Sequence, residues 1–266
     1  MKRLSFLSLV ALALMLASCS GSGNSNQVNT VTETFTVNGV SFKMAKVDGG
    51  TFAMGGTERS KEIPMDEFPA HTVKLDTFYI GQTEVTQDLW NAVMGENPSK
   101  NKGANLPLES VSWERFHDFL VKLNELTGKN FRLPTEAEWE FAARGGNFSK
   151  GYKYPGSNDL DDVAWWEENS DDHTHEVATK QANELGIYDM AGNVTEWCED
   201  WYGPYTKDAQ VNPKGAESKE PQPSMHQRVE RGGNVISNDN MCRSTRRHSE
   251  IMPSSYNELY GFRLAL

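Results

Sequence analysis

The sequence predicts an α+β fold in which an unusually large part of the chain has no regular secondary structure. Before Gly146, short alternating apolar and polar segments are typical of strands, and three segments carry helix signals. From Gly146 to the C-terminus, Gly, Asn, Asp, Pro and Trp are frequent, and the 3.6-residue period of amphipathic helices is almost absent. This composition indicates loops wrapped around an apolar centre, an arrangement that a bound ion often stabilises.

The predicted strands lie in the first third of the chain. Residues 34–44 alternate between apolar and polar side chains on both sides of Asn38-Gly39. Asn-Gly is the preferred pair of a two-residue type I′ turn, so this segment is predicted to be a β-hairpin. Residues 49–55 and Phe78–Ile80 are predicted to be two further short strands.

Two helices are predicted between residues 86 and 128. Thr86 is the expected N-cap of a helix through Met94, and Gly95 ends it. Ser112 is the expected N-cap of the second helix, which Gly128 ends. Five apolar residues of this second helix fall on one face and are expected to be buried: Phe116, Phe119, Leu120, Leu123 and Leu126.

A third helix is predicted from Thr135 to Arg144. Thr135 and Glu138 form the capping-box pattern, in which each of the two side chains accepts a hydrogen bond from the backbone N–H of the other residue. The helix is expected to end where Gly145 follows Arg144.

The first residues have the pattern of a bacterial lipoprotein signal. Lys2 and Arg3 precede an apolar run from Leu4 to Ala17, which is too short to span a bilayer. The run ends in Leu16-Ala17-Ser18-Cys19, which resembles a lipobox that is cleaved before its cysteine. The alternative is an ordinary secretory signal that a chance cysteine follows.

The predicted organisation is a lipoprotein signal peptide (residues 1–18), a lipidated flexible tether (19–30) and one folded domain (31–266). Cleavage would leave Cys19 as an acylated N-terminal residue. Ser20 stands where an aspartate would favour retention in the inner membrane. The sequence therefore predicts a lipid-anchored protein of the bacterial cell envelope, on the outer membrane and facing the periplasm.

The charge of the chain limits its partners. The formal charge is −11, and cleavage, which removes Lys2 and Arg3 but no acid, makes it −13. This charge argues against nucleic acid and against anionic membrane surfaces as partners, and it is compatible with cation binding. Acylation of Cys19 would leave Cys198 and Cys242, which are too few for a disulfide scaffold.

Seven stretches of the sequence point together to one family. They are GGTFAMG (49–55), FYIGQTEVTQDLW (78–90), VSWERFHDFLVKLN (111–124), FRLPTEAEWEFAARGG (131–146), LGIYDMAGNVTEW (185–197), RVERGG (228–233) and GFR (261–263). In this order they resemble the formylglycine-generating enzyme (sulfatase-modifying factor) family. The resemblance implies a variant of the C-type lectin-like fold with little regular secondary structure, and it implies bound calcium.

The calcium site that the resemblance implies lies between Asp189 and Glu196. These two residues match family positions that supply carboxylate oxygens, and Gly192 and Val194 match positions that supply backbone carbonyls. The alternative is that Asp189 forms an Asx turn and Glu196 pairs with an arginine. The family's second calcium site is not predicted, because its asparagine ligand falls on Trp165.

The catalytic segment is where the sequence departs from the family. Family oxidases hold Cu(I) between two thiolates that follow a Gly-Gly pair, and they use oxygen to convert a sulfatase cysteine to formylglycine. Counted from Gly232-Gly233, the two positions are Ser237 and Cys242, and the serine that follows the glycines in the oxidases is Asn234. A neutral hydroxyl is a poor Cu(I) ligand, so a standard copper site is not expected.

Three other groups of residues have two or more interpretations. Cys198 is interpreted as a small buried apolar residue, with a disulfide to Cys242 or a copper pair as alternatives. His173 and His175 lie in an acidic segment, and they form a solvated surface or bind a transition metal. Five arginines pair with carboxylates or bind an anion: Arg228, Arg231, Arg243, Arg246 and Arg247.

Two functions are compatible with these features. The favoured hypothesis is a membrane-anchored, calcium-stabilised binding or structural module, whose loops would contact a protein or glycan partner. The alternative is a formylglycine-generating oxidase, or a related copper and oxygen oxidase, which Cys242 supports and Ser237 opposes. A lipid-anchored protein outside the inner membrane would also meet few unfolded sulfatase chains.

Replacement of Cys19 by alanine tests the predicted anchor. Without the acceptor thiol no lipid can be attached, so we expect Cys19→Ala to move the protein from the membrane pellet to the supernatant after ultracentrifugation of lysed cells. Cys198→Ala serves as the control and should stay in the pellet. Sedimentation of Cys19→Ala with the membranes would show that the lipobox interpretation is wrong.

Overall fold

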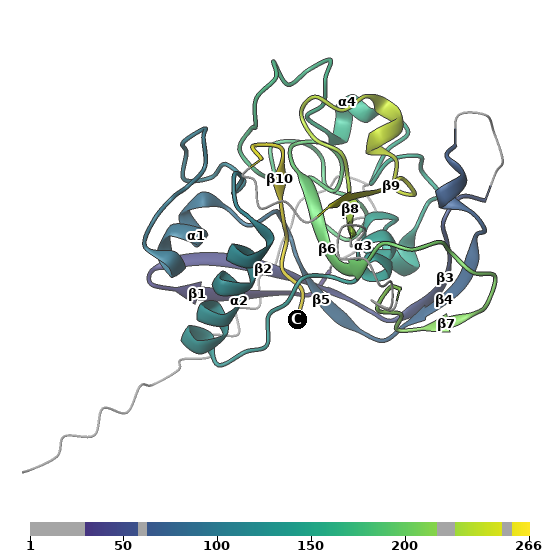
Figure 1. Cartoon of the computed structure of the whole chain (residues 1–266), viewed down its shortest axis with the longest axis horizontal. Coiled ribbons are helices and arrows are strands. Elements are labelled where there is room, and N and C mark those ends of the chain that lie inside the picture. The colour runs from purple at the N-terminus through teal and green to yellow at the C-terminus, as the bar shows by residue number, and fades with distance from the viewer. Residues whose placement is uncertain (1–29, 58–62, 217–226, 252–256) are drawn as a thin grey trace, which may run out of the picture.

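The computed structural model describes residues 30–57, 63–216, 227–251 and 257–266, and its elements form an α+β arrangement with long irregular connections (Figure 1). The predicted fold class is confirmed. The helices are α1 (Gln87–Met94), α2 (Trp113–Thr127), α3 (Glu136–Ala143) and α4 (Leu160–Val163). Short 3-10 turns are η1 (Met65–Glu67), η2 (Gly146–Phe148) and η4 (Asp239–Cys242).

The strands form three small sheets. The first has the order β1 (Thr32–Val37), β2 (Val40–Val47), β5 (Phe78–Gly81). The second has the order β3 (Gly50–Met54), β4 (His71–Leu75), β7 (Gln210–Val211). The third has the order β10 (Tyr260–Gly261), β6 (Thr195–Trp201), β8 (Gln227–Arg231), β9 (Arg247–Ile251). All pairs are antiparallel except β10 with β6 and β4 with β7.

Local sequence signals produced the elements where they were predicted. Strands β1 and β2 form the hairpin, with Asn38 and Gly39 at φ angles of 49° and 88°, as a type I′ turn requires. The capping box is present, because Glu138 N donates to Thr135 Oγ1 at 3.2 Å and Thr135 N donates to a Glu138 carboxylate oxygen at 2.8 Å. Thr86 also caps α1 through its side chain.

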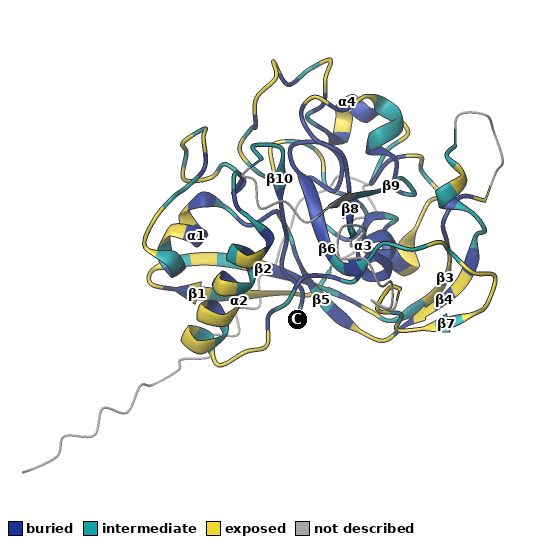
Figure 2. Ribbon diagram, in the orientation of Figure 1, coloured by how far each residue is buried: buried dark blue, intermediate teal, exposed yellow. Residues whose placement is uncertain are grey.

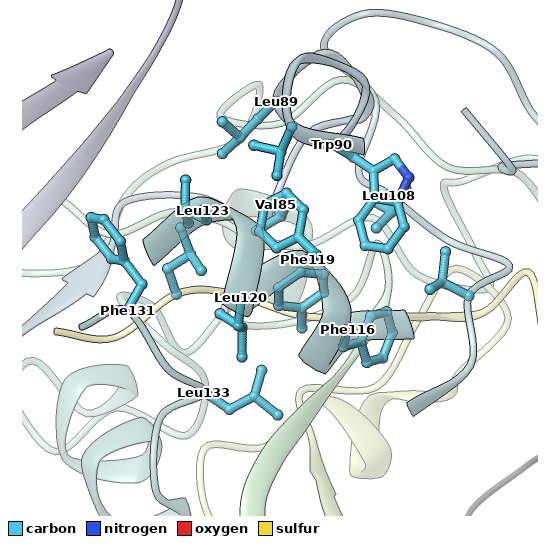
Figure 3. Close-up of a cluster of buried hydrophobic side chains, with 14 of the residues drawn as sticks. Val85, Leu89, Trp90, Leu108, Phe116, Phe119, Leu120, Leu123, Phe131 and Leu133 are labelled. Carbon is cyan, nitrogen blue, oxygen red and sulfur yellow. The ribbon is translucent and has the colours of Figure 1, made fainter. Parts of the chain in front are cut away.

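The apolar face of helix α2 packs in one cluster with residues of α1 and of the first sheet. Figure 3 shows the part of this cluster that α1, α2 and the nearby loops contribute. Four of the five predicted core residues of α2 are buried, and they pack with Trp90 of α1 and Phe131. The prediction for Leu126 was wrong, because its side chain is 53% exposed. Leu126 lies in the last turn and at the edge of the apolar stripe, where the helix extends past the core. Ser112 begins the helix without a side-chain cap.

The C-terminal half contains more regular structure than its sequence indicates. The third sheet is made of strands from residues 195–261, and its central strand β6 is almost entirely buried (Figure 2). A strand that is buried on both faces shows no alternation of apolar and polar residues, so periodicity could not predict it. The 51 residues between α3 and β6, from Arg144 to Val194, contain only η2 and α4 as helical elements.

Helix α3 carries buried carboxylates into the centre of the domain. Glu136 and Glu140 are 3% and 0% exposed. Glu140 pairs with Arg231 of β8 and, at 2.7 Å, with Arg144. Glu136 pairs with Arg247 of β9 at 2.8 Å. Burial alone would raise the pKa of Glu140, but the two arginines hold it below its usual value, so the carboxylate is ionised.

Among the described residues, no helix is both long and apolar enough to cross a membrane.

Replacement of Glu140 by glutamine tests the role of this ion pair. The change keeps the size of the side chain but leaves Arg231 with a buried charge that has lost its close partner. We expect the free energy of unfolding to fall by about 3–5 kcal/mol, as measured by urea denaturation. Glu96→Gln, which removes a solvent-exposed partner of Arg115, is the matched control and should unfold like the wild type. Equal stability of the two variants would contradict the prediction.

Candidate functional site

The substituted segment, which carries Ser237 and Cys242, follows strand β8. Gly232 and Gly233 adopt φ angles of 94° and 70°, which turn the chain away from the sheet. Ser237 then closes a local turn, because its hydroxyl accepts from Asn234 N at 2.9 Å and bonds to Asn234 Oδ1 at 3.2 Å. Cys242 ends η4 and is fully buried. Ser237 therefore stabilises the loop.

The fold still brings Ser237 and Cys242 together. A Cβ atom added to Gly233 would lie 3.1 Å from Cys242 Sγ and 3.2 Å from Ser237 Cβ. Cys242 Sγ and Ser237 Cβ therefore both lie next to Gly233. The distance between these two atoms cannot exceed the 3.1 Å and 3.2 Å distances added together. The sequence prediction that positions 237 and 242 form one site is consistent with this geometry. A side chain at position 233 would occupy the space between them.

The thiol of Cys242 lies in an apolar environment. It packs in an apolar cluster with Tyr154, Leu160 and Trp166. Burial raises the pKa of Cys242 to about 12, so the group is a neutral thiol at physiological pH. The resemblance implies a Cu(I) ion held between two thiolates, and Ser237 supplies a neutral hydroxyl in place of one of them. The residues present therefore do not fit that copper site.

Cys198 does not replace the missing thiol. It lies on β6 in a different apolar cluster, with Ala142 of α3 and Val229 of β8. Cys198 and Cys242 are both free and buried, and burial raises the pKa of Cys198 well above its usual value. The interpretation of Cys198 as a small buried apolar residue is confirmed, and the two thiols are not joined in a disulfide.

The predicted calcium segment lies at the centre of the domain. Glu196 accepts from Trp139 Nε1 at 2.7 Å and from Arg263 Nε at 2.6 Å, and its second oxygen accepts from Arg263 Nη2. Asp189, 3% exposed, accepts from Ala178 N at 2.7 Å. Glu196 thus has the arginine partner that the alternative interpretation proposed.

Backbone packing alone explains why position 192 is a glycine. Its φ angle is 74°, and an added Cβ would lie 2.1 Å from the carbonyl oxygen of Trp165. The same oxygen accepts from Asn193 N at 2.8 Å. Two backbone segments thus meet at a distance that only glycine permits. This contact explains the glycine at position 192.

The side chains around this loop do not fit a calcium ion as they stand. Calcium takes six to eight oxygen ligands, yet both oxygens of Glu196 already accept hydrogen bonds from nitrogen donors. A cation on Glu196 would also contact the guanidinium of Arg263. In the part of the chain that the structure describes, no group of three or more His, Cys, Asp or Glu side chains could hold a metal. Calcium stays a prediction, and no mechanism is derived through it.

The other candidates have ordinary structural partners. His173 and His175 stack on each other with ring centroids 4.9 Å apart, and His175 stacks on Trp165 at 3.7 Å. A ring nitrogen of each histidine bonds to a backbone oxygen at 2.8 Å. The pairing of arginines with carboxylates is confirmed for four of the five: Arg231 with Glu140, Arg243 with Glu67, Arg246 with Asp66, and Arg247 with Glu136.

A hollow of about 590 Å³ lies beside the substituted segment, and the sequence did not predict it. Tyr154 and Trp166 form its aromatic wall and also cover the thiol of Cys242. Glu167 N donates to Ser237 O at 3.2 Å and joins the hollow to the segment. The carboxylates that line it are Asp159, Asp161, Glu167, Glu168 and Asp239. The density of acidic residues from 159 to 172 is the one sequence signal that pointed to this region.

Comparison with known proteins gives the family. Residues 29–266 match the family described as "Sulfatase-modifying factor enzyme 1-like domain". The chain belongs to the sulfatase-modifying factor family. It is 35% identical to "Chaperone protein LppX" of Paenibacillus barcinonensis, covering 73% of this chain and 79% of the relative. It is 29% identical to "Formylglycine-generating enzyme" of Streptomyces coelicolor, covering 83% of this chain and 88% of the enzyme.

Solved structures of the sulfatase-modifying factor fold agree with this assignment. The structure titled "Treponema denticola variable protein 1" superposes with a TM-score of 0.78 at 33% identity, covering 88% of this chain and 98% of that chain. A second structure, PvdO from Pseudomonas aeruginosa, superposes with a TM-score of 0.67 at 25% identity, covering 84% and 93%. The expected family and its fold are therefore confirmed.

Ser237→Cys tests whether one substitution separates this site from a copper site. The new thiol would lie across Gly233 from Cys242, so we expect this variant, once reduced, to bind one Cu(I) per chain. The wild type should bind none and should form no aldehyde on a Cys-x-Pro-x-Arg peptide with copper and oxygen. Titration against a Cu(I) chelator and mass spectrometry of the peptide measure the two effects.

Ser237→Ala is the control for a change of size without a thiol, and it should bind no copper. Aldehyde formation by the wild type at the rate of a family oxidase would contradict this prediction.

Proposed function

We propose that this chain is a lipid-anchored binding module of the sulfatase-modifying factor family that does not carry out the family's copper-dependent oxidation. The observation that supports it most is the pair Ser237 and Cys242: one is a hydrogen-bonded hydroxyl and the other a buried neutral thiol. The fold of the family is present, whereas a hydroxyl replaces one of the two soft ligands that its oxidation chemistry needs.

The binding site in this proposal is the acidic hollow next to that segment. Its five carboxylates outnumber the cations at its rim. Lys153 Nζ is bonded to Asp239 at 2.9 Å, and Lys180 Nζ to the backbone oxygen of Asp161 at 2.8 Å. Glu167 and Glu168 are exposed, while the aromatic wall behind them is buried.

The exposed carboxylates of the hollow favour a cationic ligand. Ammonium and guanidinium groups bind carboxylates through charge-assisted hydrogen bonds. A lysine- or arginine-rich segment of a partner protein provides several such groups at the spacing of a peptide. The name of the chaperone relative supports a protein partner over a glycan.

The predicted lipid anchor suits a binding function. Acylation at Cys19 would hold the domain at the outer membrane, where the tether would allow it to reach partners in the periplasm. A binding module benefits from this location, because the anchor raises its effective concentration near membrane-bound partners.

The second candidate function is oxidation of a protein cysteine. It is supported by the relatives named formylglycine-generating enzyme and by the glycine that still separates positions 237 and 242. It would require Cys242 to act without a second thiolate and against its raised pKa. The binding function therefore fits the side chains better.

A labelled hexalysine peptide tests the proposed site. We expect the full chain to bind it, and Glu167→Gln/Glu168→Gln to bind it about tenfold more weakly or worse, by fluorescence anisotropy at low salt. The matched control is Asp118→Asn/Glu125→Gln, which removes two carboxylates from a groove beside α2 and should bind like the wild type. A glycine–serine peptide should not bind. Equal affinity of the two double variants for hexalysine would contradict the location of the site.

A further inference from the structure

Arg263 is a fully buried cation at the centre of the domain. It follows β10, and its side chain is 0% exposed. Its guanidinium group donates to both oxygens of Glu196, which lies on β6. It also donates to three backbone carbonyl oxygens: Gly81 O at 3.0 Å, Tyr188 O at 3.1 Å and Asp189 O at 3.2 Å.

One side chain thus holds together segments that are far apart in the sequence. Gly81 ends β5, Tyr188 and Asp189 belong to the irregular segment before β6, and Glu196 lies within β6. The five oxygens that Arg263 contacts are two from a carboxylate and three from the backbone. Carboxylate and backbone oxygens around a short glycine-containing loop are also the ligands that calcium takes in proteins.

We propose that Arg263 stabilises this loop in place of calcium, so that the domain folds and keeps its stability without the ion. A guanidinium carries five N–H donors in a rigid planar fork, which suits a bidentate carboxylate together with further carbonyls. A calcium ion on Glu196 would displace these donors and would lie against a positive charge.

The two other carboxylates beside this loop also accept hydrogen bonds from the protein. Asp189 Oδ2 accepts from Ala178 N at 2.7 Å. The neighbouring carboxylate of Glu84 accepts from Val194 N at 3.2 Å and from Asn193 Nδ2 at 2.9 Å. Each carboxylate at this loop thus accepts from at least one nitrogen donor of the protein.

Thermal unfolding of the full chain with calcium or with a chelator tests the inference without any substitution. We expect the midpoint to be the same, within about 1 °C, in 1 mM calcium and in 1 mM EGTA. A structural ion present at about 100 times its Kd would instead raise the midpoint of a domain of this size by roughly 5–10 °C. A rise of that size that Glu196→Gln abolishes would overturn the inference.

Replacement of Arg263, with a matched control, tests whether its guanidinium group stabilises the loop. Arg263→Lys keeps the charge but loses the fork, so we expect its midpoint to fall by about 10 °C in both calcium and EGTA. The matched control is Arg132→Lys, which alters a bidentate pair with Glu138 whose arginine is 40% exposed, and it should shift the midpoint far less. An equal fall in the two variants would show that the five contacts of Arg263 are not what stabilises the loop.

Discussion

The structure depends on buried carboxylates that are paired with arginines from distant parts of the chain. Glu136 and Glu140 enter the interior on α3, and Arg231 and Arg247 reach them from β8 and β9. Burial of a single one of these charges would be strongly unfavourable, so each is stable only when its partner is in place. The ion pairs therefore fix the position of α3 relative to the third sheet. The loops that connect these elements are held in place at both ends.

This constraint explains how a chain with so little regular structure holds a defined site. The segment that carries Ser237 and Cys242 connects β8 to β9, and both of these strands are tied to α3. Arg263, which follows β10, forms a further ion pair with Glu196 of β6, the strand next to β8. These ion pairs do not involve Ser237 or Cys242, so the scaffold does not depend on the residue types at those two positions. A family member can lose a catalytic thiol and keep its fold, which is why fold alone does not give its activity.

Much of the fold could be predicted from the sequence, because the signals were local. The Asn38-Gly39 turn and the capping box at Thr135 depend on residues at most three positions apart, and both formed as predicted. The family followed from motifs that stay in order along the chain, and so did the substitution at Ser237. Leu126 was misplaced because periodicity gives the face of a helix but not where the core beneath it ends.

The tertiary structure decided what depends on contacts between distant segments. The sequence by itself determined the family, the local elements and the missing thiol at position 237. It could not give the partner of Glu196, since Arg263 lies 67 residues away, nor the close approach of Trp165 to Gly192. It also could not show that Cys242 is buried behind an acidic hollow, because burial and pKa depend on all the chain segments that surround a group. The type of a residue determines which reactions its side chain could take part in. The packing around that side chain determines its exposure and its pKa, and therefore which of these reactions remain possible.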